Sequence, residues 1–406
     1  EEEGFFAQGD IDSSGNCGNW RTNRGILIKN RHYKKGVVLR NQHLILTLLK
    51  FNIKKGNKMR EKMKAVAVVG KGKIDIIEMT KPVPKSEQIL VKIRACALCT
   101  YEQRVYNGIK EMPLPFVGGH EFTGVIDGIG SEIDSENYKI GTKVAVRILY
   151  KCGSCYYCRR GKENLCVGIN RSTVTEPGIS GIGGLGEYIV VDTSQVWKLP
   201  DDISLEKATF AEPIACVVNS IKNGDPELGD DVVIIGGGVM GMLDLILSKM
   251  RGARTIMSEP DEARRKLAME LGCDIVIDPS KEDPVKAVKE LTGGRGAEVV
   301  FNTTPISAVA EQAVQMTGSL GRCVMYSSQH PDVPIKISAN WLHNSEAIVT
   351  GAVSPSVYSF ETAINLLSKN LINPGKLISG IYDYTQGSEA FAKAAAPGSY
   401  RVIIKF

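Results

Sequence analysis

The chain has 406 residues, 43% of them hydrophobic and 23% charged, which suits a globular protein of two or three domains at roughly 150 residues each. Residues 1–58 contain 11 of the 50 Lys and Arg but only 5 of the 45 Asp and Glu, so this segment carries +6 and the remainder −1. A main body so close to neutral argues against a nucleic-acid or membrane-surface partner.

The sequence contains ten cysteines, too few for a disulfide-dense secreted scaffold of this length. Four of them form one cluster with metal-binding spacing, so we expect a reduced, cytoplasmic protein. The longest apolar stretches, Leu44–Leu49 and Val232–Ile235, are far shorter than the roughly 20 residues of a membrane helix. We therefore expect neither a signal peptide nor a membrane partner.

Residues 1–58 differ from the rest of the chain because they mix Asn, Lys, Arg and Gly without clean periodicity, and a regular pattern begins only at Met63. We expect this leader to lie outside the fold, as an upstream sequence read through or as a disordered extension. The alternative is a short arm that binds acidic partners, and such an arm would resist limited proteolysis.

The segment 63–215 is predicted to be a β-rich domain, because short apolar runs alternate with Gly and Pro turns. Its first two strands form a hairpin around Gly70 and Gly72. The predicted strands are Ala65–Val69, Ile74–Glu78, Gln88–Ala95, Glu121–Ile129, Lys143–Val146 and Gly186–Val191.

Four cysteines lie close together in this domain, within 152–166: Cys152, Cys155, Cys158 and Cys166. Four thiolates can close a tetrahedron around Zn²⁺ with no open position, which predicts a structural zinc lobe. A ferredoxin iron–sulfur run also begins C-x₂-C-x₂-C, but its next cysteine follows after three residues and precedes a proline. Here seven residues intervene and Val167 follows. The segment is polar, which disfavours four unrelated core cysteines.

From residue 216 the pattern changes to alternating strands and helices, which predicts a Rossmann-type doubly wound parallel sheet over 216–345. The first strand, Asp231–Ile235, is almost entirely apolar, as expected when both faces are buried. The other predicted strands are Thr255–Ser258, Ile275–Ile277, Glu298–Asn302, Arg322–Ser327 and Ala347–Ala352.

Helices are predicted at Val239–Met250 and Glu262–Leu271, with others between the later strands. The final segment, 346–406, is predicted to add the last strand of the parallel sheet. A helix at Ser359–Ser368 and a closing strand at Arg401–Phe406 would then return the chain to the first domain.

A glycine-rich turn joins the first strand of the parallel sheet to its helix. Gly236, Gly238 and Gly241 form G-x-G-x-x-G, with Val239 and Met240 inside the motif. The first glycine permits a tight turn, the second lets the backbone approach a pyrophosphate, and the third allows close helix packing. We expect phosphates to bind at the helix N-terminus, where free N–H groups and the helix dipole favour negative charge.

An acidic residue after the second strand indicates NAD rather than NADP as the cofactor. Glu259 lies 18 residues after Gly241, and a carboxylate there binds the ribose hydroxyls and repels a 2′-phosphate. Arg264 and Arg265 follow closely and could instead accept that phosphate. Glu259 could also be a solvated loop acid, with the arginines on a helix face.

A second group of possible metal ligands is dispersed along the chain. Cys99 follows a strand, His120 and Glu121 lie in a glycine-rich segment, and Glu212 precedes a proline. A soft thiolate, an imidazole and a carboxylate make a suitable incomplete zinc shell. Taken singly, Cys99 could be a core residue, His120 a turn residue and Glu212 a helix cap.

Together these features resemble the zinc-containing medium-chain dehydrogenases, and the sorbitol and threonine dehydrogenase branch most of all. The resemblance runs from Met63 to Phe406 and implies an α/β fold, with a β-rich GroES-like catalytic domain and a Rossmann domain. The matching segments are Gly119-His120-Glu121-x-x-Gly124-x₅-Gly130, the four-cysteine spacing, Gly186-Glu187-Tyr188, Gly236–Gly241 and Gly293-Gly294-Arg295-Gly296-Ala297.

The resemblance implies that Cys99, His120 and Glu212 bind a catalytic zinc. Glu121 would lie next to the metal and could enter its shell. Simple alcohol dehydrogenases have a second cysteine where this chain has Glu212, and Glu-Pro at that place is similar to the polyol and threonine branch. Cys216 is a nearby rival ligand.

The residues after Cys99 depart from the family pattern. Tyr101 stands where relatives carry a small hydroxyl that relays the substrate proton, and Arg104 stands where many carry a histidine. The proton could pass through the phenol of Tyr101, through Thr100 if the turn is rotated, or directly to water.

The hypothesis is therefore a dehydrogenase of secondary alcohols or polyols that uses NAD and two zinc ions per chain, in a homodimer or homotetramer. The substrate could be sorbitol-like, a polyol phosphate or threonine-like. Arg104, Lys110 and Arg147 could bind the phosphate of a polyol phosphate, or they could be solvated surface charges. One alternative is a reductase of a ketose or keto-sugar phosphate in vivo. Another is a non-catalytic relative that binds the cofactor.

Overall fold

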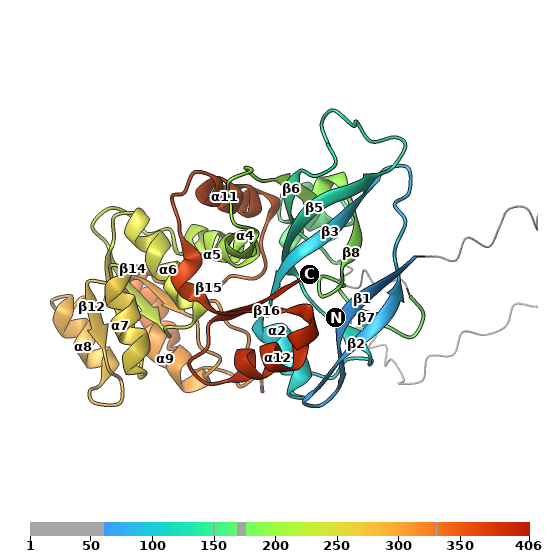
Figure 1. Cartoon of the computed structure of the whole chain (residues 1–406). Helices are drawn as coiled ribbons and strands as arrows, with labels where there is room; N and C mark the ends of the chain where they lie inside the picture. Colours follow the sequence, from blue (N-terminus) through green and yellow to red (C-terminus); the bar gives the residue numbers. More distant parts are fainter. Residues whose placement is uncertain (1–60, 149–150, 169–175, 330) are drawn as a thin grey trace, which may run out of the picture. The chain divides into compact units, whose positions relative to one another are not determined.

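A computed structural model describes residues 61–148, 151–168, 176–329 and 331–406 (Figure 1). The expectation for the leader, 1–58, concerns residues outside these ranges. All element bounds and contacts below refer to the described part of the chain.

Two antiparallel-rich sheets follow the start of the described chain. Their strands are β1 Lys62–Gly70, β2 Lys73–Thr80, β3 Gln88–Ala97, β4 Phe116–Val117, β5 Glu121–Ile129, β6 Lys143–Val146, β7 Ser180–Gly181, β8 Tyr188–Asp192, β9 Val196–Lys198, β16 Ile378–Asp383 and β17 Arg401–Lys405. The smaller sheet has the order β2-β1-β4-β7, and its first pair is the predicted hairpin. The larger sheet has the order β16-β17-β3-β5-β6-β9, with β8 paired to β3.

Glycines in the segment before and within β5 determine how closely this strand approaches its neighbours. A Cβ on Gly124 would lie 2.2 Å from the carbonyl oxygen of Lys92 on β3, so a larger residue would separate the paired strands. Gly119 has φ +91° and lies against the backbone of Gly184 and Leu185. The glycine-rich segment that predicts a metal site therefore also allows the left-handed backbone at Gly119 and the close approach of β5 to β3.

The parallel sheet has six strands in the order β12-β11-β10-β13-β14-β15, as predicted for a doubly wound fold. The strands are β10 Asp231–Ile235, β11 Arg254–Ser258, β12 Ile275–Ile277, β13 Ala297–Asn302, β14 Thr317–Met325 and β15 Ile348–Gly351. Every residue of β10 is buried, which explains its apolar sequence. The predicted fold class is confirmed.

The helices of the described chain pack on all three sheets. They are α2 Thr100–Tyr106, α3 Tyr156–Arg159, η1 Glu163–Leu165, η2 Thr193–Gln195, α4 Leu205–Ala208, α5 Ala211–Gly224, α6 Val239–Met250, α7 Glu262–Glu270, α8 Pro284–Leu291, α9 Ser307–Met316, α10 Ala339–Ser345, α11 Val357–Ser368, η3 Pro374–Leu377, η4 Tyr384–Gln386 and α12 Gly387–Ala395. Helices α5, α6, α7 and α9 pack against strands of the parallel sheet, and α8 packs on α9 (Figure 1). The chain then returns, because β17 pairs antiparallel with β3.

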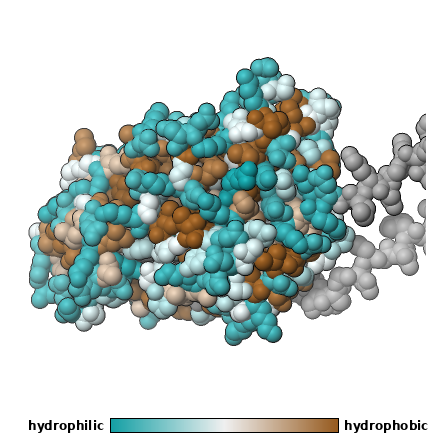
Figure 2. Space-filling model, viewed as in Figure 1, coloured by the Kyte–Doolittle hydropathy of each residue, from teal (hydrophilic) through white to brown (hydrophobic). Residues whose placement is uncertain are grey.

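Apolar residues on the face shown in Figure 2 are interspersed with polar ones. Among the described residues, no helix is both long enough and apolar enough to span a bilayer.

Candidate active site

Three separate elements bring the predicted metal ligands together. Cys99 is the N-cap of α2, two residues after the end of β3. The pairing of Ala97 with Glu121 places the end of β3 beside the start of β5, where His120 lies. Glu212 lies in the first turn of α5.

The side chains form two overlapping groups that share His120. One ligand atom from each of Cys99, Glu102 and His120 lies within 4.8 Å of the others, and the same holds for His120, Glu121 and Glu212. The structure thus gathers all four predicted residues around one imidazole. A thiolate, an imidazole and carboxylates are a donor set that fits Zn²⁺.

Glu102 is a member of this site that the sequence analysis did not identify as a site residue. It is fully buried, and its carboxylate accepts hydrogen bonds from the backbone N–H of Cys99 at 3.1 Å and Gly119 at 2.9 Å. It also lies 3.1 Å from Nδ1 of His120. A proton on Nδ1 donated to Glu102 would leave Nε2 with the free lone pair that a metal needs.

The electrostatics of this pair favour its charged forms. Burial opposes ionisation of Glu102, but His120 and the backbone donors outweigh it and lower the pKa of the carboxyl. Burial likewise opposes the imidazolium, yet the charges of Glu102 and Cys99 raise the pKa of His120 well above its ordinary value. A positive charge, whether proton or metal, is therefore stabilised at this imidazole.

Arg401 is the second residue that the sequence analysis missed. Its Nε and Nη2 donate to the two carboxylate oxygens of Glu121 at 2.7 and 2.6 Å, and both side chains are buried. Nη2 also lies 3.6 Å from the sulfur of Cys99. Arg401 therefore orients Glu121 and places a buried positive charge beside the thiol.

The rival ligand Cys216 lies one helical turn after Glu212. Its thiol donates to Glu212 Oε1 at 3.2 Å. Burial raises the pKa of both groups, and that of Cys216 is raised well above its ordinary range. The thiol of Cys216 therefore acts as a hydrogen-bond donor to the carboxylate of Glu212.

A cavity of about 120 Å³ opens at this group of residues. It is lined by Tyr101, His120, Arg147, Ile148, Ile182, Glu212, Ser354 and Pro355. The ring of Tyr101 stands edge-on to that of His120, with 5.9 Å between centroids. Its hydroxyl lies 3.8 Å from Sδ of Met112, while the hydroxyl of Thr100 lies 3.8 Å from Sγ of Cys99.

The three basic residues considered for phosphate binding have different surroundings. Arg147 is buried, and its guanidinium donates to the carbonyl oxygen of Pro355, so it is not a solvated surface charge. Lys110 is exposed, with Nζ 4.7 Å from the centroid of the Tyr101 ring. Arg104 is half-buried in α2 and does not line the cavity.

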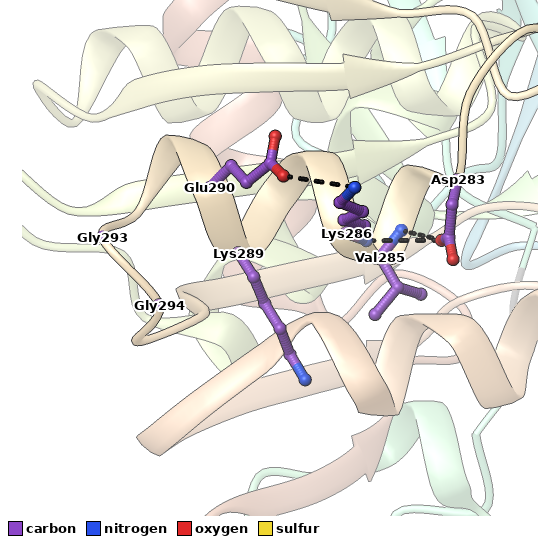
Figure 3. Close-up of a pocket in the computed structure, with 7 residues that line it drawn as sticks. All are labelled: Asp283, Val285, Lys286, Lys289, Glu290, Gly293 and Gly294. Carbon is purple, nitrogen blue, oxygen red and sulfur yellow. Dashed lines mark hydrogen bonds and ion pairs between the residues drawn. The ribbon is translucent and has the colours of Figure 1, made fainter.

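A larger concavity of about 520 Å³ lies on α8 and the turn that follows it (Figure 3). Asp283 caps this helix by accepting the N–H groups of Val285 and Lys286. Lys286 in turn pairs with Glu290 at 3.7 Å. These charges stabilise the helix itself, and the described lining shares no residue with the cavity at His120.

The four-cysteine lobe is assembled as its spacing suggests. The sulfurs of Cys152, Cys155, Cys158 and Cys166 lie within 4.8 Å of one another, and all four are free thiols. Backbone N–H groups of Ser154 and Cys155 lower the pKa of Cys152 to about 6, whereas burial raises that of Cys158 to about 12. A closed group of four sulfurs with N–H donors around them fits a structural zinc ion.

The glycine-rich turn has the geometry that its three positions require. Gly236 has φ +98°, and a Cβ on Gly241 would lie 1.8 Å from the carbonyl oxygen of Gly236. A Cβ on Gly238 would meet nothing within 4 Å, so the space in front of this residue is open. The N-terminus of α6 thus faces a space in which a pyrophosphate could bind.

Glu259 lies beside this turn and is buried, which excludes a solvated loop acid. Its two carboxylate oxygens accept the N–H groups of Gly237 at 2.5 Å and Asp261 at 2.8 Å. The guanidinium of Arg264 is 4.0 Å from the carboxylate. Arg265 donates to the backbone carbonyl oxygens of Glu259 and Pro260 and pairs with Asp278.

Two family descriptions match the chain: an alcohol dehydrogenase GroES-like domain over residues 85–201, and a zinc-binding dehydrogenase over residues 239–369. The chain is 30% identical to L-threonine 3-dehydrogenase of Pyrococcus horikoshii, covering 85% of this chain and 99% of that protein. It is 28% identical to D-arabitol-phosphate dehydrogenase of Enterococcus avium, covering 86% and 98%.

Solved structures are similar over the same region. A zinc-binding dehydrogenase from Sinorhizobium meliloti bound to NADP has a TM-score of 0.78 at 26% identity, covering 85% of this chain and all of that one. 2R,3R-butanediol dehydrogenase from Bacillus subtilis has a TM-score of 0.75 at 25% identity, covering 85% and 99%.

Proposed function

Because the chain belongs to the zinc-dependent medium-chain alcohol dehydrogenase family, we propose that it oxidises a secondary alcohol or polyol with NAD⁺ as hydride acceptor. The substrate loses a hydride to the nicotinamide and a proton to the surroundings, giving a ketone and NADH. The observation that carries this proposal is that Cys99 and Glu212 both lie close to His120, beside a cavity that His120 and Glu212 line.

We assign Cys99, His120 and Glu212 as ligands of a catalytic zinc, with Glu121 next to it. When bound, zinc would supply Lewis acidity that lowers the pKa of the substrate hydroxyl. Glu102 fixes the tautomer of His120 through Nδ1. The four cysteines of the lobe would hold a second, structural zinc.

The remaining roles belong to the cofactor and the proton. The backbone at Gly236–Gly241 receives the pyrophosphate, and Glu259 receives the ribose hydroxyls; its negative charge supports NAD over NADP. Tyr101 lines the cavity with its ring edge-on to that of His120, and we assign its hydroxyl the proton relay. Replacing Tyr101 with Phe should then lower kcat by about 10²-fold, whereas Thr100→Val should have little effect.

The proposed substrate class is supported by the relatives named above, whose names give a polyol phosphate, a hydroxy amino acid and a diol as substrates. The experiment is a panel of polyols, polyol phosphates, threonine, butanediol and simple alcohols, each with NAD⁺ and with NADP⁺. Formation of NADH from one class supports the proposal. No turnover by protein that holds both zinc ions would contradict it and favour the non-catalytic alternative.

A further inference from the structure

One wall of the candidate substrate cavity is the segment that joins β15 to α11. Ser354 and Pro355 of this segment line the cavity with His120 and Glu212. Ser354 has φ +55°, a left-handed conformation that residues with a Cβ rarely adopt. Such a conformation persists only where the surrounding structure holds it. The contacts that hold this segment therefore shape the cavity.

Two asparagines of α5 hold the segment from one side. Nδ2 of Asn223 donates to the carbonyl oxygen of Gly351 at 2.8 Å. Nδ2 of Asn219 lies 3.4 and 3.3 Å from the carbonyl oxygens of Val353 and Ser354. β15 stops at Gly351, and beyond it the carbonyl groups of Val353 and Ser354 are bonded to a side chain.

The four-cysteine lobe holds the same segment from the other side. Nδ2 of Asn164 donates to the carbonyl oxygen of Val353 at 2.9 Å, and the Glu163 carboxylate accepts the N–H of Val357 in the first turn of α11. Glu163 and Asn164 are only 5% and 8% exposed, so these bonds are shielded from water. Both residues lie in η1, immediately before Cys166.

Arg147 connects the lobe directly to the cavity. Its Nε and Nη2 donate to the carbonyl oxygen of Pro355 at 3.3 and 3.0 Å, and Nη2 lies 3.9 Å from Oε1 of Glu163. The three consecutive carbonyl oxygens of Val353, Ser354 and Pro355 therefore all accept side-chain donors. A lobe more than 180 residues away in the sequence thus holds the wall of the cavity.

We propose that Glu163 and Asn164 are positioning residues for the substrate, through which the four-cysteine lobe sets the place of Ser354 and Pro355 in the cavity wall. The lobe is then coupled to substrate binding and does more than stabilise its own loop. The inference rests on the proposed alcohol oxidation for its kinetic readout, but its structural readout is independent of activity.

The experiment replaces Asn164 with Ala in the full-length protein. Loss of the bond to Val353 should speed hydrogen exchange of the amides in 352–358. The KM of the alcohol found in the substrate panel should rise about tenfold, with a smaller change in kcat. The matched control is Asn365→Ala, an exposed asparagine on α11 whose amide is 3.4 Å from Glu361, which should change neither quantity.

A second variant tests the proposal if Asn164→Ala fails to fold. Glu163→Gln keeps an acceptor for the N–H of Val357 but removes the charge beside Arg147, so we expect smaller changes in the same direction. Unchanged exchange and KM in Asn164→Ala protein of native melting temperature would overturn the proposal, as would faster exchange with an unchanged KM. Failure of the proposed function would instead appear as no alcohol oxidation by the wild type, with the exchange comparison still measurable.

Discussion

Arg401 and Glu121 form a buried, two-pronged ion pair across 280 residues of sequence, with N–O distances of 2.7 and 2.6 Å. It ties the closing strand β17 to the start of β5, where His120 and Glu121 lie. Burial opposes the charge on Arg401, but Glu121 and the nearby Cys99 outweigh that effect and raise its pKa. The guanidinium of Arg401 thus neutralises the buried carboxylate of Glu121 beside the candidate metal ligand Cys99.

Replacing Arg401 with Met should destabilise the fold by about 3–5 kcal/mol, because it leaves the Glu121 carboxylate buried and unpaired. Urea unfolding measures this loss. Arg401→Lys, which keeps the charge but not the two-pronged geometry, should be intermediate. The double variant Arg401→Met with Glu121→Gln should recover part of the stability; equal losses in the single and double variants would show that Glu121 is not the reason.

Replacing Cys99 with Ser should lower the zinc content by one ion per chain and abolish turnover, because the thiolate is an assigned ligand. Binding of NADH, measured by its fluorescence, should stay intact because the glycine-rich turn lies at the start of α6, which holds none of the assigned zinc ligands. Cys273→Ser is the control, because Cys273 is buried and donates to the carbonyl of Ile275, as a serine also could. Persistent turnover with the full zinc content would show the assignment of Cys99 to be wrong.

Replacing Glu259 with Gln should raise the efficiency with NADP⁺ relative to NAD⁺ by about tenfold, equivalent to about 1.4 kcal/mol. The change removes a negative charge next to the ribose position and frees Arg264, 4.0 Å away, to meet a 2′-phosphate. Steady-state kinetics with both cofactors test this. Adding Arg264→Gln should cancel the gain, and an undiminished gain would exclude Arg264 as its source.

The strands of the parallel sheet were predictable because burial on both faces gives an apolar run between turn residues, as in Asp231–Ile235. The start of β14 was predicted wrongly. The strand begins at Thr317, which pairs with Ala297, and reaches the predicted start at Arg322 only after Leu320 turns through φ +63°. A left-handed leucine has no sequence signal, so no pattern could have extended that strand.

Site residues that lie within one short sequence motif were predictable, whereas residues whose partners are distant in the sequence were not. His120 and Glu121 lie in one short glycine-rich segment. Glu102 had a local signal, since an acid three residues after the N-cap Cys99 forms a capping box. Arg401 had none, because its pairing with Glu121 depends on β17 returning to β3.

The hydrogen bonds of Glu163 and Asn164 to the cavity wall likewise had no counterpart in the sequence pattern. They join segments that are separated by more than 180 residues, and neither residue belongs to a recognised motif. Side-chain bonds to irregular backbone leave no periodicity, so only the folded arrangement reveals them.

The last prediction concerns a carboxyl group away from the candidate site. Asp244 in α6 is fully buried, and among the described residues neither of its oxygens has a hydrogen-bond partner. Burial raises the pKa of Asp244 well above its ordinary value, and the nearby Ser220 hydroxyl offsets only part of that effect. The folded protein therefore keeps this proton at pH values where the unfolded chain has lost it.

Stability should consequently fall as the pH rises from the ordinary carboxyl pKa of about 4 toward the raised value, because the unfolded state binds fewer protons in that window. Asp244→Asn removes the titrating group, so the variant should gain about 1–3 kcal/mol over the wild type near neutral pH and much less below pH of about 4. Urea unfolding at several pH values measures the difference, with Asp202→Asn at an exposed position as the control. A difference that shrank with rising pH would show that Asp244 is ionised in the folded protein.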